Sequence, residues 1–77
     1  MNRAYITATA DGAERYGAAI AQDCLDDMLT MTSQGPRMAR LQAAILELRQ
    51  LSHPKRAAGG FAVVVISAIE IGLGLSK

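Results

Sequence analysis

The stretch GGFAVVVISAIEIGLGLSK, residues 59–77, decides how the fold is interpreted. Between Gly59 and Leu75 its only charged side chain is Glu70. Three structures are compatible with so apolar a run: a buried strand, a helix docked on protein, or a membrane span. The β-branched cluster from Val63 to Ile66 favours a strand by propensity. This strand, over residues 61–71 and paired with a short N-terminal strand, is the alternative fold.

The spacing of the polar residues favours a helix instead. Ser67, Glu70 and Gly74 follow one another at steps of three and four, which places them on one stripe of a helix, whereas a strand turns Ser67 and Glu70 to opposite faces. A stripe of small and polar residues on an apolar helix allows another helix to approach closely. We therefore predict that this stripe contacts a partner, together with the apolar side chains of Phe61, Val64 and Val65.

A membrane span is the competing interpretation of the same residues. At 1.5 Å per residue the apolar run is roughly 25 Å long, at the short end for a spanning helix. Lys55 and Arg56 flank its N-terminal end, so the positive-inside tendency predicts a tail-anchored protein whose N-terminal part stays in the cytoplasm. An accessory membrane subunit or a holin-like protein has this topology.

The preceding residues predict a hairpin of two amphipathic helices. Asp11, three residues before Glu14, suggests a capping box that starts the first helix, over residues 11–34. Gly35 and Pro36 suggest a tight corner, and a second apolar stripe predicts a helix over residues 36–52. Residues 1–10 are expected to form an arm or short strand, residues 53–60 a basic joint, and residues 61–77 the apolar segment.

Charges support the antiparallel arrangement of this hairpin. Asp23, Asp26 and Asp27 fall late in the first predicted helix, and Arg37 and Arg40 fall early in the second. An antiparallel pair of helices brings these opposite charges together near the turn. Because exposed ion pairs contribute only about 0–1 kcal/mol, we predict that Arg37 and Arg40 set the register more than the stability.

Composition narrows the function classes. A chain of 77 residues buries little surface on folding, so a partner or a second copy is expected to stabilise it. A net charge of +1 and 4% aromatic residues argue against nucleic acid as a ligand. The single cysteine, Cys24, and the single histidine, His53, assemble no convincing catalytic or metal-binding set. We expect no enzyme activity, no cofactor, no metal and no small-molecule substrate.

Together these patterns predict a mostly α protein: a helical hairpin followed by an apolar C-terminal helix. The predicted function is that of a small non-enzymatic accessory or assembly protein that buries this helix on a protein partner or on another copy of itself. The alternative is the tail-anchored membrane protein. The predicted location is correspondingly the cytoplasm, or a membrane with the N-terminal part in the cytoplasm.

Overall fold

The computed structural model describes residues 3–73, and this part of the chain is built from helices. They are α1 (Arg3–Ile6), α2 (Ala10–Leu29), α3 (Gln34–Arg49) and α4 (Pro54–Leu73). The predicted mostly α fold is confirmed. Within residues 3–73 there is no strand, so the strand alternative is not supported: residues 61–71 lie in α4, and the N-terminal segment, which was to pair with them, forms the short helix α1.

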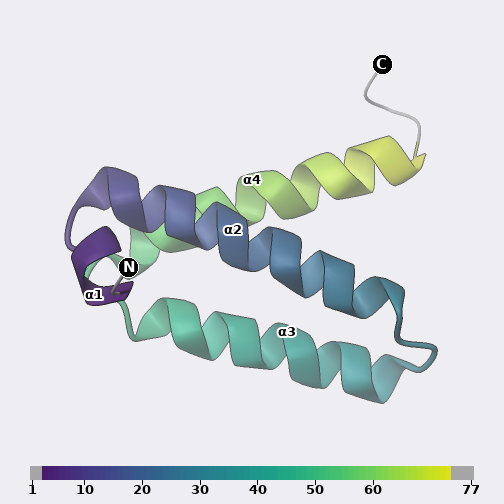
Figure 1. Ribbon diagram of the computed structural model, residues 1–77. Helices are drawn as coiled ribbons and strands as arrows, with labels where there is room; N and C mark the ends of the chain where they lie inside the picture. The colour runs from purple at the N-terminus through teal and green to yellow at the C-terminus, as the bar shows by residue number, and fades with distance from the viewer. Residues whose placement is uncertain (1–2, 74–77) are drawn as a thin grey trace.

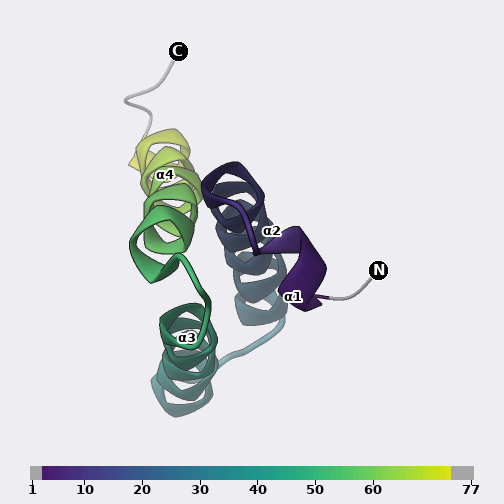
Figure 2. The same ribbon diagram turned by 90° about the vertical axis from the view of Figure 1, so that its left-hand side faces the viewer.

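The three long helices form an open V instead of a closed bundle. In Figure 1, α2 and α3 run antiparallel as a hairpin, while α4 runs in the same direction as α2 and lies across its N-terminal half. Figure 2, which looks along the helices from the end where α2 and α4 begin, shows α4 and α3 on one side of α2. Beyond the crossing, the C-terminal halves of α2 and α4 separate.

Two glycines bring α2 and α4 together at the crossing. A Cβ atom added at Gly17 would collide with the backbone carbonyl of Ala57, and one added at Gly60 would collide with the backbone carbonyl of Glu14. Only hydrogen side chains allow the two backbones to approach this closely. The crossing is therefore specified by glycine at one position on each helix.

The core lies beside this crossing and is made largely of small side chains. Its larger buried members are Ile20, Leu48 and Leu51, and the half-buried Phe61 packs against them. The buried apolar residues are Ala13, Ile20, Ala21, Cys24, Ala44, Leu48, Leu51 and Ala57. Because α4 is covered only along its first half, the core does not extend to the far end of that helix.

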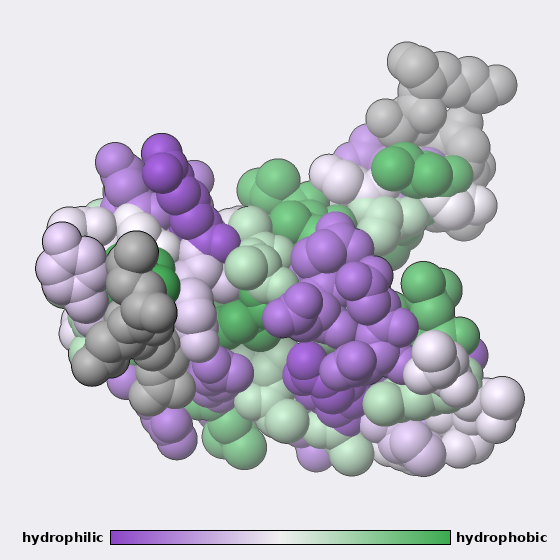
Figure 3. Space-filling model, viewed as in Figure 1, coloured by the Kyte–Doolittle hydropathy of each residue, from purple (hydrophilic) through white to green (hydrophobic). Residues whose placement is uncertain are grey.

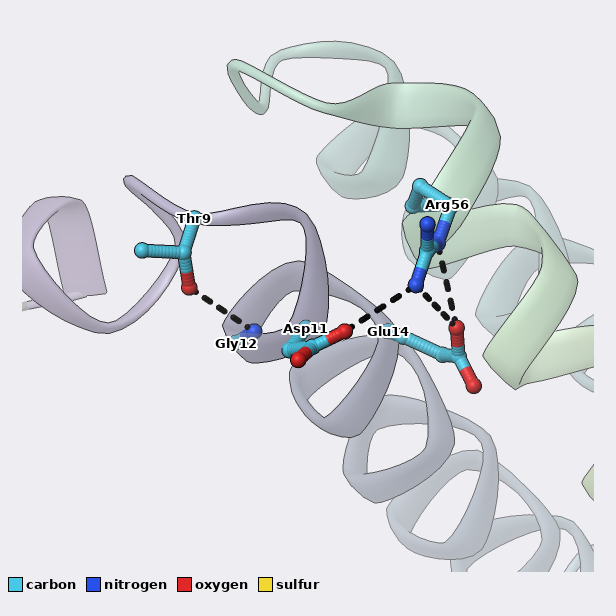
Figure 4. A network of polar contacts seen from close by, with 5 residues as sticks. All are labelled: Thr9, Asp11, Gly12, Glu14 and Arg56. Atoms are coloured by element: carbon cyan, nitrogen blue, oxygen red, sulfur yellow. Dashed lines mark hydrogen bonds and ion pairs between the residues drawn. The ribbon is translucent and has the colours of Figure 1, made fainter.

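Both ends of α2 differ from the sequence prediction. The N-cap is Thr9, whose hydroxyl accepts a hydrogen bond of 3.0 Å from the Gly12 amide, so Asp11 lies inside the first turn (Figure 4). An acidic residue in that turn still complements the helix dipole. At the other end, α2 stops at Leu29, where the Thr30 hydroxyl donates to the Asp27 carbonyl.

The corner between α2 and α3 also falls elsewhere than predicted. Ser33 is the N-cap of α3, which places Gly35 and Pro36 inside the first turn of that helix. Proline is tolerated there because the first amides of a helix have no intrahelical acceptor. The helix ends at Arg49, three residues before the predicted end.

Residues 54–60 of the predicted basic joint are helical, because α4 begins at Pro54, a favoured first residue of a helix. The Arg56 guanidinium then binds α2: its Nη2 atom lies 3.1 Å from a carboxylate oxygen of Asp11 and 3.0 Å from one of Glu14 (Figure 4). The two acidic residues assigned to a capping box thus hold the start of α4. This contact lies at the closed end of the V.

Candidate functional site

An apolar groove runs between the diverging halves of α2 and α4, with a volume of about 480 Å³. We call it the α2–α4 groove. Its α2 wall is formed by Gln22 and Leu25. Its α4 wall is formed by Val63, Val64, Ser67, Ala68 and Ile71. Apart from one amide and one hydroxyl, the side chains of both walls are hydrocarbon.

The groove extends toward both ends of the V. At the closed end it continues past Val63 to a smaller hollow lined by Arg15, Ala18 and Gly60, among others. At the open end it continues past Leu25 to a hollow that includes Leu29 and Arg37. In the space-filling view, apolar side chains lie on the far part of α4 and on the end of α2, with a hollow between the two arms (Figure 3).

Large aliphatic side chains are exposed along the far half of α4. The exposed fractions are 64% for Val63, 54% for Ile66, 55% for Ile69 and 69% for Ile71. Isolated exposed aliphatic residues are ordinary, whereas these four are clustered on one helix. No helix within residues 3–73 combines the length and apolar character needed to cross a membrane.

Glu70, on α4, and Arg15, at the closed end of the groove, have no ionic partner within residues 3–73. Glu70 is half-buried on α4 beside Val63 and Ile66, and no cation of the described residues pairs with its carboxylate. Arg15 is exposed at the closed end, and no described carboxylate pairs with its guanidinium. Both are thus available to a molecule that enters the groove.

The interaction residues predicted in the apolar segment lie in different environments in the structure. Ser67 and Val64 line the groove, and Glu70 lies near its rim. Phe61 instead packs against the core, and Val65 is half-buried. Gly74 lies outside the described residues. The predicted stripe therefore contributes Ser67 to the lining of the groove, while Phe61 helps to hold α4 in place.

The two predicted register arginines behave differently. Arg40 donates a 2.7 Å hydrogen bond from Nε to the Asp27 carboxylate, joining α3 to α2 near their turn. This bond raises the pKa of the Arg40 guanidinium above its ordinary value. Arg37 donates instead to the backbone carbonyl of Met31, at 2.6 Å, and its side chain borders the open end of the groove.

The Arg40 pair predicts a measurable but small coupling. In a double-mutant cycle of Arg40→Glu and Asp27→Arg, each single change should lower the free energy of unfolding, and the double change should recover about 0.2–1 kcal/mol, because the pair is partly exposed. Urea denaturation of the four proteins measures this. Additive effects of the two changes would mean that the pair does not set the register. Arg49→Glu, on the same helix, serves as the uncoupled control.

The α2 wall of the groove was not predicted from the sequence. Leu25 and Leu29 widen the apolar stripe of α2 beyond the width that one neighbouring helix covers, which was a usable signal. They face the groove instead of the core, and Leu29 is 83% exposed. Arg15 had no such signal, because its position beside Val63 depends on how α4 crosses α2.

Cys24 and His53, which were considered for chemistry, and Tyr16 have structural contacts. Cys24 is buried in the core. An imidazole nitrogen of His53, Nε2, lies 3.1 Å from the Ala8 carbonyl, so this residue ties the start of α4 to the N-terminal segment. The Tyr16 hydroxyl donates a 2.7 Å hydrogen bond to Glu47, from α2 to α3. Within residues 3–73, no three potential metal ligands lie close enough together to hold an ion.

Comparison with protein-family models, with curated proteins and with solved structures found no match. The function is therefore inferred from the groove, the exposed aliphatic side chains and the charges beside them.

Proposed function

We propose that this protein is a small non-enzymatic assembly protein that acts by protein–protein interaction. It binds through the far half of α4 and the α2–α4 groove, burying both against a partner or another copy of itself. The observation that carries this proposal is the exposure of Val63, Ile66, Ile69 and Ile71 beside an apolar groove.

Energetics support a protein partner. Fully burying a valine or isoleucine side chain contributes about 1.5–3 kcal/mol, so four half-exposed ones leave several kcal/mol for binding to release. A chain of 77 residues is also marginal in stability, and a ligand that binds only the folded state adds to it. Association would thus add the stability that the open arrangement does not gain from burying these side chains within one chain.

The lining of the groove suits packing better than catalysis. A catalytic site needs convergent polar groups that move protons or stabilise charge. The walls of the α2–α4 groove present the Gln22 amide and the Ser67 hydroxyl among aliphatic side chains. This composition resembles the apolar centre of a protein interface, with charged residues such as Arg15 and Glu70 at the rim.

Site-specific photo-crosslinking in the protein's own cells tests the proposal. A benzophenone amino acid at Ile69 should give a discrete protein adduct, and the same group at the exposed Lys55, on the other end of α4, should not. Adding Ile66→Asp to the Ile69 probe should abolish the adduct, because a charge would then be buried. Absence of a protein adduct at Ile69, or an equal adduct at Lys55, would contradict the proposal.

A further inference from the structure

We infer that the α2–α4 groove is filled by the far half of α4 from a second copy of this chain, in an antiparallel two-fold dimer. This inference rests on the proposed function and specifies its partner. The same helix supplies one wall of the groove and the exposed aliphatic side chains that can fill it. A two-fold interface requires such self-complementarity, since each copy gives and receives the same element.

The register follows from the position of the groove along α4. Its α4 wall runs from Val63 to Ile71, with Ser67 in the middle. Two antiparallel α4 helices related by a two-fold axis near Ser67 place Glu70 of one copy opposite Val64 of the other. The small Ser67 side chain at the axis allows the two helices to approach closely, as the glycines do at the crossing of α2 and α4.

Charge complementarity singles out this register. Arg15 lies along the groove beside Val63, at the closed end. The second copy's Glu70, opposite Val64, therefore comes within reach of the Arg15 guanidinium, because Arg15 and Val64 line the same hollow, and the two-fold axis repeats the pair. Both groups lack an ionic partner within residues 3–73 of a single chain. The dimer thus gives each of these two charges an ionic partner.

The exposed aliphatic area of one copy is comparable with the apolar area that one side of a stable dimer interface buries. Full burial of a large aliphatic side chain removes on the order of 100 Å² from water. The exposed aliphatic side chains at the end of α2 and on the far half of α4 therefore offer roughly 300 Å² per copy, before the half-buried walls are added. They are Leu29, Val63, Ile66, Ile69 and Ile71. One side of a standard interface buries roughly 450 Å² of apolar surface. A net charge of +1 opposes self-association only weakly.

Analytical ultracentrifugation of the full-length protein tests the dimer. The wild type should sediment with twice the chain mass of 8.1 kDa, and Ile66→Asp should sediment as a monomer with unchanged helicity by circular dichroism. Leu46→Asp, an exposed leucine on α3, is the matched control and should remain dimeric. A monomeric wild type, or a dimer that tolerates Ile66→Asp, would overturn the inference.

A charge exchange tests the register. Glu70→Arg and Arg15→Glu should each self-associate at least about tenfold more weakly, because each homodimer contains two like-charge pairs. An equimolar mixture of these two variants should regain wild-type affinity, because the mixed dimer contains one native pair and one reversed pair. Adding Arg49→Glu to Glu70→Arg restores the net charge but leaves both like-charge pairs at Arg15, so this double variant should regain nothing. A mixture of the first two variants that associates no better than either alone would overturn the inference.

The crosslinking and sedimentation results separate the two proposals. An Ile69 adduct with a second copy, together with a dimer in the ultracentrifuge, supports both. An Ile69 adduct with a different protein, together with a monomer in the ultracentrifuge, supports the proposed function and overturns the dimer. An Ile69 adduct with lipid alone overturns both.

Discussion

Gly17→Ala should destabilise the protein by about 1–3 kcal/mol, although alanine is the better helix former. The added methyl group would occupy the position of the Ala57 carbonyl, and this neighbour is helix backbone, which cannot move aside as a flexible side chain would. The helices must separate to accommodate it. Thermal unfolding should show a midpoint lower by at least about 4 °C for a domain of this size.

Gly59→Ala is the matched control, and its effect should have the opposite sign. Gly59 lies inside α4, and a Cβ atom added there meets nothing within 4 Å. The substitution should therefore stabilise the fold by about 0.5–1 kcal/mol through helix propensity alone. Equal effects at Gly17 and Gly59 would show that the close crossing of α2 and α4 does not exist in solution.

Leu48→Ala should be the most destabilising truncation in the core, by about 2–5 kcal/mol. Leu48 is 5% exposed, and most of its buried neighbours are alanines that cannot expand to fill the cavity left behind. A domain of 77 residues has a total stability of about 4–12 kcal/mol. Chemical denaturation should therefore show the loss of a large fraction of the free energy of unfolding.

Leu46→Ala provides the comparison on the same helix. Leu46 is 56% exposed, so its truncation should change the free energy of unfolding by less than about 0.5 kcal/mol. Similar losses at the two leucines would mean that α3 packs on α2 through a different face. Neither residue belongs to the α2–α4 groove, so association does not obscure the comparison.

Local patterns in the sequence were sufficient to predict the helices. The apolar stripes of α2 and α3 have helical spacing, and the polar residues of the C-terminal run share one helical face, which outweighs the strand propensity of Val63, Val64 and Val65. Helix ends were less predictable, because Thr9 and Asp11 are both good caps and the choice between them depends on Arg56, which is distant in sequence.

The relation between the helices required tertiary information. The sequence did not predict that Gly17 and Gly60 lie at a contact between two helices. A glycine inside a helix can weaken the helix, allow another backbone to approach closely, or simply be exposed. The structure places Gly60 at a close approach and Gly59, its neighbour, in open space. The groove and the position of Arg15 depend on that crossing. The sequence therefore predicted an apolar surface on the C-terminal segment but did not predict the shape of that surface.

A small rotation of α4 about the glycine crossing moves the far end of this helix by a larger distance. Its pivot lies near Gly60, and about twelve further residues extend to the free end, a length of about 18 Å. A rotation of about 10° at the pivot moves that end by about 3 Å, which is the difference between admitting and excluding a bulky side chain. The width of the groove is thus governed from its closed end, so we expect a substitution at Gly17 to change the affinity for the proposed occupant although Gly17 does not line the groove.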